Sequence, residues 1–341
     1  MRVGKIKEFL ENNNLPAFRL KQIIKAVYED SVSLFTEITT LSKDLREKLD
    51  DEIEILSFEV VEVLKSKNKD SFKALLKLSD GNYIETVLLK VMPGHLSACI
   101  SSQAGCPMGC KFCATGKNGF KRNLTSEEIT DQVLFWRQYI KKNNMEGQFS
   151  NIVVMGMGEP FMNYDNLKQA LHNLTDEQTF NLASRHISVS TSGLVDGIKK
   201  FSHDFPQINL AVSLIVANNE KRDELMPVNH KFSLRELKNA IDMYIDTTNR
   251  KVFLEYVMFA GVNDNQSDAR NLIEFIESSN RSDLLHVNLI RYNEATLDFK
   301  PSPKDTVKWF KQYLENRGIN VTIRKSLGQE IKAACGQLAG K

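Results

Sequence analysis

Three of the five cysteines in this chain lie close together in the run GCPMGCKFC, at residues 105–113. Their spacing is C-x3-C-x2-C, which places thiols at Cys106, Cys110 and Cys113. A structural zinc site usually closes with four ligands in two pairs, and the sequence contains no second CxxC pair. A 4Fe-4S cluster takes one thiolate on each iron. The spacing therefore predicts such a cluster with three protein ligands and one open iron. Three incidental buried cysteines are the alternative.

A second run that could bind a ligand, VMGMGEP, ends the next apolar stretch at residues 154–160. Gly158 would let a ligand approach the backbone, and Glu159 could bind the ammonium group of an amino acid. Alone this pattern is weak, because a glycine turn before a proline is commonly only a turn. Its place at the end of the stretch that follows the cysteine cluster makes it a candidate ligand site.

Two cysteines lie outside the cluster. Cys99 belongs to the apolar run LSACISS just before it, where a lone cysteine is usually part of the core. Cys335 lies in AACGQL near the end of the sequence, a segment of small residues that is too short for a core helix. Such a segment could carry a thiol to a site built by other parts of the chain.

The composition limits the kind of protein that carries these cysteines. The 341 residues are 42% hydrophobic and 26% charged, an ordinary soluble composition with room for one large domain and a smaller one. No signal peptide and no apolar run of membrane-spanning length, about 18 residues, is visible, which predicts a cytoplasmic protein without a membrane partner. A net charge of +2 neither demands nor excludes a nucleic acid. In a reducing cytoplasm, cysteines suit metal binding or catalysis better than structural disulfides.

Hydrophobic periodicity divides the chain into four parts. Residues 1–55 predict a small helical accessory domain, and residues 56–91 a short antiparallel β extension with a turn at residues 79–82. Residues 92–330 alternate strand-like apolar runs with amphipathic helices in about six β-α units. Residues 331–341 form a C-terminal tail that carries Cys335.

The long alternating region predicts an α/β fold. Capping boxes at Thr125 with Glu128 and at Ser233 with Glu236 mark helix starts, and Pro303 fits a first helical turn. Short, continuous apolar runs are typical of buried parallel strands, so we expect a partial (βα)6 barrel with a wide mouth. Ligands of such sheets bind beyond the carboxyl ends of the strands. The cysteine cluster falls in one of the loops at that end.

The C-x3-C-x2-C spacing after the first strand of such a barrel resembles the radical S-adenosylmethionine superfamily. A longer ordered series resembles one branch of it, the RlmN/Cfr family of rRNA adenine methyltransferases. The series consists of CISSQAGCPMGCKFCATG, VVMGMGEP, RHISVSTSG, ELMPVN, FLEYVMFAGVND, HVNLIRYN and AACGQLAGK. It covers nearly all of residues 85–341, and the helical start also fits. An ordered series is far more specific than one cysteine motif.

The resemblance implies a 4Fe-4S cluster held by Cys106, Cys110 and Cys113, and two molecules of S-adenosylmethionine per turnover. One molecule methylates Cys335. The other binds the open iron and is cleaved to a 5′-deoxyadenosyl radical, which takes a hydrogen from the S-methyl group. The methylene radical then adds to an electron-poor adenine carbon and leaves a protein–RNA crosslink.

Two further roles are implied by matching motifs. Glu85, in the run Ile84-Glu85-Thr86-Val87, matches the glutamate that accepts the proton from the adduct carbon. Without the resemblance, Glu85 would be interpreted as a solvated strand residue. Cys99 matches the thiol that attacks the sulfur of Cys335, forms a transient disulfide and releases the product.

Contacts with S-adenosylmethionine are also implied by motif, at Gly158, Glu159, Ser190, Ser213, Leu214, Ile215 and Asn293. One of these positions departs from the family pattern. The family commonly reads SLHA where this chain has Ser213-Leu214-Ile215-Val216. Isoleucine offers no side-chain hydrogen bond, so a contact made there by histidine is missing or is made by the backbone.

The implied partners are RNA molecules: an adenine of 23S rRNA at the peptidyl-transferase centre and, as a further candidate, an adenine next to the anticodon of tRNA. RlmN-like members methylate C2 and Cfr-like members methylate C8. The runs LIRYN and CISSQ are closer to Cfr, whereas RlmN is the housekeeping member, so C2 is the prediction and C8 the alternative. Phosphate contacts are expected from Lys117, Lys121, Arg122, Arg185, Arg324 and Lys325, although each alone is more commonly a solvated charge.

A reductant such as flavodoxin or ferredoxin is also implied, and a monomer is expected. Two other classes of protein remain as alternatives. A non-catalytic iron-sulfur RNA-binding protein would be brown and bind RNA without forming 5′-deoxyadenosine. A zinc-binding module would be colourless.

Overall fold

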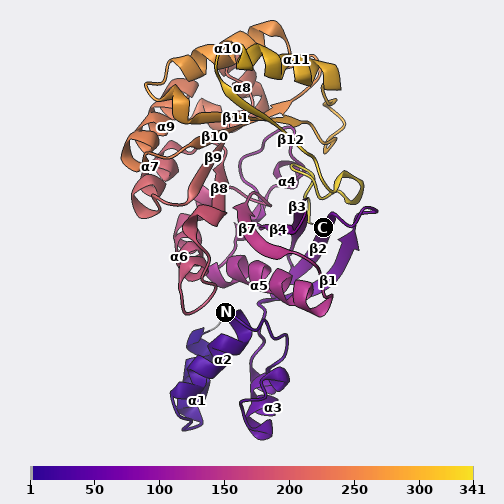
Figure 1. Ribbon diagram of the computed structural model, residues 1–341, viewed down its shortest axis with the longest axis vertical. Coiled ribbons are helices and arrows are strands. Elements are labelled where there is room, and N and C mark those ends of the chain that lie inside the picture. Colours follow the sequence, from indigo (N-terminus) through magenta and orange to yellow (C-terminus); the bar gives the residue numbers. More distant parts are fainter. Residues whose placement is uncertain (1–2, 341) are drawn as a thin grey trace.

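The computed structural model describes residues 3–340. Residues 1, 2 and 341, the outermost positions of the predicted N-terminal domain and tail, lie outside that range. The chain begins with α1 (Val3–Asn12), α2 (Phe18–Tyr28), the 3-10 turn η1 (Phe35–Glu37) and α3 (Lys43–Glu52). Each α-helix buries apolar residues at helical spacing, as Ile6, Phe9 and Leu10 do in α1. Figure 1 shows these helices as a small lobe at one end of the molecule.

The helical lobe is fastened to the rest of the chain through α5 (Ser126–Lys142). Gln138 Nε2 donates a hydrogen bond to the Val32 carbonyl at 2.8 Å. The ring of Tyr28 packs edge-on against Phe180 with their centroids 4.8 Å apart. The helical lobe therefore packs against the main body through defined contacts.

One ten-stranded sheet forms the centre of residues 3–340. In spatial order its strands are β1 (Phe58–Lys65), β2 (Ser71–Leu78), β3 (Tyr83–Met92), β4 (His95–Cys99), β7 (Gln148–Val154), β8 (Ile187–Thr191), β9 (Asn209–Ser213), β10 (Val252–Met258), β11 (Leu285–Arg291) and β12 (Asn320–Arg324). The first four strands pair antiparallel, and from β4 to β12 all neighbours are parallel. The predicted antiparallel strands are thus continuous with the barrel wall, because β3 pairs with β4.

Six long helices connect the parallel strands and lie on the outside of the sheet (Figure 1). They are α5, α6 (Tyr164–Thr175), α7 (Val195–Asp204), α9 (Leu234–Thr248), α10 (Gln266–Glu277) and α11 (Lys304–Glu315). The capping boxes at Thr125 and Ser233 begin α5 and α9 as predicted, and Pro303 is the residue that precedes α11. The shorter elements are α4 (Ala114–Lys117), α8 (Asn219–Leu225), η2 (Pro160–Asn163), η3 (Ser184–His186), η4 (Pro227–His230), η5 (Ser282–Leu284) and η6 (Gln329–Ile331).

The two faces of the parallel sheet differ in polarity. Alternate residues such as Ile152, Leu210 and Val287 are fully buried in the core that the outer helices share. Each buried aliphatic side chain of this kind contributes about 1.5–3 kcal/mol. The opposite, inner face carries polar residues, and the register places Ser213 beside Glu255 and Glu255 beside Asn288. Because a closed barrel packs apolar side chains inside, this polar inner face indicates a site.

Two short strands were not anticipated from the sequence. β5 (Gln103–Gly105) and β6 (Phe120–Asn123) pair antiparallel and close off the loop that contains the cysteine cluster. The cysteine loop therefore follows the carboxyl end of β4 and is held closed by the pairing of β5 with β6. Within residues 3–340, no helix has the length and apolar character needed to cross a bilayer.

Candidate active site on the inner face of the sheet

The cysteine cluster lies between β5 and β6 in a tightly folded loop. Cys106 N donates to the Gly119 carbonyl at 3.0 Å, and Cys113 N donates to the Cys110 carbonyl at 3.2 Å. Gly105 has φ +76°, and a Cβ there would lie 2.0 Å from the Gly119 oxygen. Only glycine fits where the two arms of the loop meet, so this residue sets how closely the thiols gather.

The three thiols fit an iron-sulfur cluster by their chemistry. Burial raises the pKa of Cys106 to about 12. Burial, and then the neighbouring thiols of Cys113 and Cys106, raise the pKa of Cys110 well above its ordinary value. Thiolates in such surroundings need a bound cation. Among residues 3–340, no three His, Cys, Asp or Glu side chains lie close enough together to hold one metal ion. A 4Fe-4S cluster does not need such a group, because each thiolate binds a different iron.

Apolar residues pack behind the cysteine loop. Cys110 and Phe112 contact a buried group that includes Ile215, Leu225 and Phe259. The rings of Phe112 and Phe259 lie 5.4 Å apart, and Lys111 N donates to the Leu225 carbonyl at 3.1 Å. Such packing keeps water from a cluster and tunes its potential.

A buried arginine that the sequence did not single out ties together the strand ends beside this loop. Arg222 is fully buried, and its guanidinium donates to the carbonyls of Leu214 at 3.1 Å and Ser192 at 2.7 Å, and to Asn229 Oδ1 at 2.9 Å. Burial lowers its pKa to about 10. Its contacts join the loops that follow β8 and β9. The available signal was one cation within the charged run of residues 220–224, EKRDE, which is typical of a solvated helix face.

The glycine–glutamate run follows β7, as predicted. Glu159 is buried, and its carboxylate accepts hydrogen bonds from Ser192 N at 2.6 Å and Phe161 N at 3.1 Å. Burial raises the pKa of this carboxyl, and the two backbone hydrogen bonds oppose the rise. The structure thus places Glu159 between the β7 and β8 ends, near the cysteine loop, with two of its acceptor positions already used.

Replacing Gly158 by alanine should destabilise this corner. Gly158 has φ +102°, and an added Cβ would lie 2.6 Å from Gln103 Cβ in β5. Gly81 is a matched control, because it has φ +83° with nothing within 4 Å of an added Cβ. We expect Gly158→Ala to lower the free energy of unfolding by about 1–3 kcal/mol more than Gly81→Ala, measured by chemical denaturation. Equal losses would show that only the backbone angle matters.

The remaining predicted S-adenosylmethionine contacts separate into two groups. Ser190 and Ser213 are half-buried on the inner face, where a ligand could reach them. Leu214 and Ile215 are buried. Ile215 also has φ +66°, an uncommon angle for a β-branched residue that costs about 1–3 kcal/mol. Its N–H donates to the Glu255 carbonyl at 3.1 Å, and its side chain packs in the apolar group behind the cysteine loop.

Asn293 holds the C-terminal tail. It is buried, its Nδ2 donates to the Cys335 carbonyl at 3.2 Å, and its Oδ1 accepts from Gln329 Nε2 at 2.6 Å. The tail runs from β12 past α4 toward the β2–β3 hairpin, drawn in yellow in Figure 1. Asn293 was predicted to contact S-adenosylmethionine, and in this structure its amide is used to place the residue that carries the thiol.

The tail is also bound to α4, which directly follows Cys113. Ala114 N donates to the Gly336 carbonyl at 2.8 Å, and Asn118 Nδ2 donates to the Ala339 carbonyl at 2.7 Å. Thr115 Oγ1 donates to the Leu338 carbonyl at 2.5 Å. The cysteine loop and the tail therefore form one hydrogen-bonded unit.

The thiols of Cys335 and Cys99 lie within electrostatic reach of each other. Burial, and then the nearby Glu255 carboxylate, raise the pKa of Cys335, although the residue is exposed. Burial raises the pKa of Cys99 as well, and Cys335 adds to the rise. Cys335 thus lies near the inner face of the sheet, which carries Glu255 and Cys99.

Glu85 is buried, with 6% of its surface exposed, so the interpretation as a solvated strand glutamate is wrong. Its Oε1 lies 2.6 Å from Lys73 Nζ, and its Oε2 accepts from Ala339 N at 2.7 Å. The register pairs Val87 with Cys99, which puts Glu85 and Cys99 on the same face of the sheet. Lys73 was missed because its partner depends on strand register.

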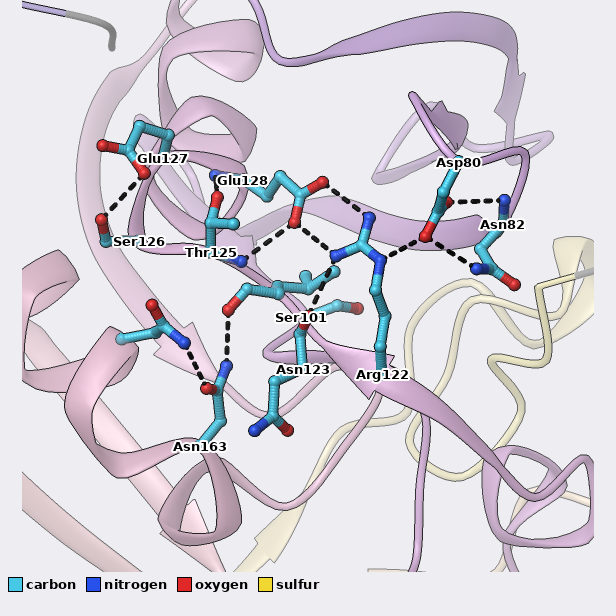
Figure 2. A network of polar contacts seen from close by, with 12 residues as sticks. Asp80, Asn82, Ser101, Arg122, Asn123, Thr125, Ser126, Glu127, Glu128 and Asn163 are labelled. Atoms are coloured by element: carbon cyan, nitrogen blue, oxygen red, sulfur yellow. Dashed lines mark hydrogen bonds and ion pairs between the residues drawn. The ribbon is translucent and has the colours of Figure 1, made fainter.

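Two of the cations expected to contact phosphate are paired with carboxylates. Figure 2 shows Arg122 between Asp80, in the β2–β3 turn, and Glu128, at the start of α5. Its Nη1 and Nη2 lie 2.7 and 2.8 Å from the Glu128 oxygens. The side-chain hydrogen bond from Arg122 lowers the pKa of Asp80. Lys117 Nζ is 2.6 Å from Asp298. Arg122 therefore holds β6 to its neighbours, and Lys121, Arg185, Arg324 and Lys325 stay predictions.

Comparison with known proteins identifies the family. A model described as the radical SAM superfamily matches residues 100–276, and a model of the ribosomal RNA large subunit methyltransferase N-terminal domain matches residues 1–55. The chain is 42% identical over 340 residues to "Ribosomal RNA large subunit methyltransferase Cfr" of Bacillus velezensis, covering 98% of this chain and 95% of that protein. It is 40% identical over 343 residues to "Probable dual-specificity RNA methyltransferase RlmN" of Chlorobium phaeobacteroides, covering 98% and 93%.

A solved structure has the same fold from end to end. The crystal structure of a radical SAM methyltransferase from Sphaerobacter thermophilus, 36% identical, superimposes with a TM-score of 0.92 over 100% of this chain and 98% of that one. This agreement confirms the predicted fold class and the resemblance seen in the ordered motifs. With its three clustered thiols at the carboxyl end of β4, the chain belongs to the RlmN/Cfr family of radical S-adenosylmethionine methyltransferases.

Proposed function

We propose that this enzyme methylates an adenine of 23S rRNA at C2, with Cys335 as the carrier of the methyl group. Relatives that are 40–42% identical over nearly their whole length are named ribosomal RNA large subunit methyltransferases or RNA methyltransferases, which supports RNA as the substrate. The same names favour a catalyst over a protein that only binds RNA. An adenine in folded RNA would have to be splayed out to reach the inner face of the sheet.

The observation that carries the proposal is the placement of the tail. Cys335 is held by Asn293 and by the tail's bonds to α4, beside the cluster thiols. Glu85 accepts a hydrogen bond from the backbone of the same tail, and the strand register puts Cys99 on the same face of the sheet as Glu85. These contacts support the proposed roles of Cys335 as methyl carrier, Cys99 as resolving thiol and Glu85 as proton acceptor.

The cofactors would be bound by separate groups. Cys106, Cys110 and Cys113 would hold the 4Fe-4S cluster, which together with S-adenosylmethionine supplies one-electron chemistry that generates a carbon radical. A flavodoxin or ferredoxin would provide the electron, and we expect the protein to act as a monomer. The cluster loop would keep water out through the packing of Phe112 and Ile215.

We place S-adenosylmethionine along the carboxyl ends of the parallel strands. Gly158 and Glu159 would take its amino group, while Ser190 and Ser213 offer hydroxyls from the inner face. Asn293, and the backbone at Leu214 and Ile215, would complete the set. These last three already have hydrogen-bond partners, so they would have to exchange or share them.

The chain's own residues would then act in order. The S-methyl group of Cys335 would lose a hydrogen, and its carbon would form the bond to the adenine carbon. Glu85 would accept the proton that this carbon gives up. Cys99 would attack the sulfur of Cys335 and form a disulfide, while the electron pair of the broken carbon–sulfur bond stays on the methylene carbon. The proton given up by the Cys99 thiol would complete the methyl group, and the methylated base would leave. A reductant would restore the two thiols.

C8 methylation is the second candidate, because several relatives of 40–42% identity are named Cfr. Incubation of unmodified 23S rRNA and tRNA transcripts with enzyme, S-adenosylmethionine and reductant, followed by digestion and mass spectrometry, separates the outcomes. We expect 2-methyladenosine in the rRNA, and none when the target adenine is changed to guanine. Only 8-methyladenosine would replace C2 by C8. No methylated adenosine with an active, iron-loaded enzyme would overturn the proposal.

A further inference from the structure

A buried lysine lies against the carboxylate that we propose as the proton acceptor. Lys73 Nζ is 2.6 Å from Glu85 Oε1, and the two side chains are only 10% and 7% exposed. Removing two charges from water costs several kcal/mol per ion, and their attraction only roughly repays it. An apolar pair would therefore serve the fold as well, which points to a role for the charges themselves.

The register fixes this pair on the face that carries the reactive thiols. Lys73 on β2 pairs with Val87 on β3, and Val87 pairs with Cys99 on β4. Lys73, Val87 and Cys99 thus form one row across three strands, and Glu85 is the diagonal neighbour of Lys73 two residues before Val87. The Lys73 ammonium group therefore contacts the Glu85 carboxylate from the neighbouring strand.

The two oxygens of Glu85 have different partners. Oε1 is held by Lys73, whereas Oε2 accepts from the tail amides of Ala339 at 2.7 Å and Gly340 at 3.3 Å. Because the tail is held at Oε2 only by hydrogen bonds, Oε2 can give up these bonds when the substrate becomes bonded to Cys335. The Lys73 contact belongs to the sheet and does not depend on the tail.

The backbone of Glu85 is fixed independently of its side chain. Ser101 Oγ donates to the Glu85 carbonyl at 2.6 Å and accepts from Met157 N at 2.8 Å. The Glu85 N–H points at the Met157 sulfur, 3.3 Å away. Loss of Lys73 would therefore free the end of the side chain while the strand stays in place.

We propose that Lys73 is a positioning residue for proton removal, an inference that rests on the proposed role of Glu85. It anchors Oε1 so that Oε2 can exchange the tail amides for the proton on the adduct carbon. In that step the C–H bond breaks, its electron pair stays with the adenine and the proton bonds to Oε2, while the surplus electron of the radical adduct leaves to a one-electron acceptor, a role that the oxidised 4Fe-4S cluster would fill. Lys73 keeps its protons and its hydrogen bond to Oε1, and the neutral acid later returns the proton to solvent.

The test compares Lys73→Met with Lys77→Met in the full-length, cluster-loaded enzyme. Lys77 lies on the same strand but is 44% exposed and pairs at 3.6 Å with the surface residue Glu59. We expect Lys73→Met to lower the yield of methylated RNA by about tenfold or more, because a misplaced base loses much of its effect. Methylation of Cys335 should continue, and the protein–RNA crosslink should accumulate. Lys77→Met should behave as the parent enzyme, and Lys73→Arg should recover part of the loss.

A double variant keeps the test valid where Lys73→Met leaves the Glu85 carboxylate buried without its cation and disturbs folding. Lys73→Met with Glu85→Gln buries no unpaired charge, and it should give the same residual RNA methylation as Glu85→Gln alone. A further loss in the double variant would overturn the proposal, as would full activity or absence of crosslink in a folded Lys73→Met enzyme. Failure of the parent enzyme to methylate RNA would instead count against the proposed function.

Discussion

Replacement of Cys335 by alanine should abolish methyl transfer to RNA while the cluster remains bound. The proposed reaction passes every methyl group through the sulfur of this residue, and the tail places no second thiol at the same position. Asn293 and α4 hold the tail through its backbone, so an alanine tail should dock in the same place. Transfer of a labelled methyl group from S-adenosylmethionine to RNA measures the loss, and iron content confirms that the cluster is retained.

Cys99→Ala is the matched control for this experiment, because it removes a thiol that is proposed to act at a later step of the same reaction. Cys99 is proposed to act only after the carbon–carbon bond has formed. We therefore expect Cys99→Ala to trap the protein–RNA crosslink, whereas Cys335→Ala should form none. Undiminished RNA methylation by Cys335→Ala would refute the carrier role, whatever the result with Cys99.

Single replacement of Cys106, Cys110 or Cys113 by alanine should remove both the cluster and all RNA methylation. Three thiolates bind three of the four irons and leave one open. A variant with only two of these thiolates has too few ligands to hold the cluster. Burial raises the pKa of Cys106 and Cys110, so these thiols gain their ligand form only with the metal. Anaerobic purification followed by iron and sulfide analysis and an absorbance spectrum measures the effect.

Cys99→Ala is again the comparison, since it should keep the iron and the brown colour of the parent. A parent protein that is colourless and contains zinc would contradict the cluster assignment for this chain. Variants that lose only one of the three thiols and still carry a full complement of iron would show that another side chain completes the set.

Much of the fold followed from local signals in the sequence. The alternation of short apolar runs with amphipathic helices predicted the β-α units, and capping boxes such as Thr125 with Glu128 located helix starts to the residue. β5 and β6 escaped because they are short and half polar, and they exist through a tertiary contact at Gly105 and Gly119. Local propensity carries no trace of such a pairing.

The site residues also separate into those that could be predicted from the sequence and those that depend on tertiary contacts. The cluster cysteines were visible because their ligand spacing is local, and Glu85, Cys99 and Cys335 came from the family resemblance. Lys73 and Arg222 could not be found, since their partners come from strand register and from loop carbonyls. Arg122 illustrates what charge alone leaves out. A basic residue near a predicted RNA site was expected to bind phosphate, and the fold had already given it two carboxylates.

The continuity of the sheet has a consequence for dissecting the protein into parts. Since β3 pairs with β4, a truncated chain that starts at Leu96 would retain the cysteine loop and the parallel strands but lose Glu85 and Lys73. Its β4 would become a free edge, with unpaired amide and carbonyl groups open to other copies of the chain. A minimal catalytic fragment should therefore begin before β1, and shorter truncations are prone to self-association.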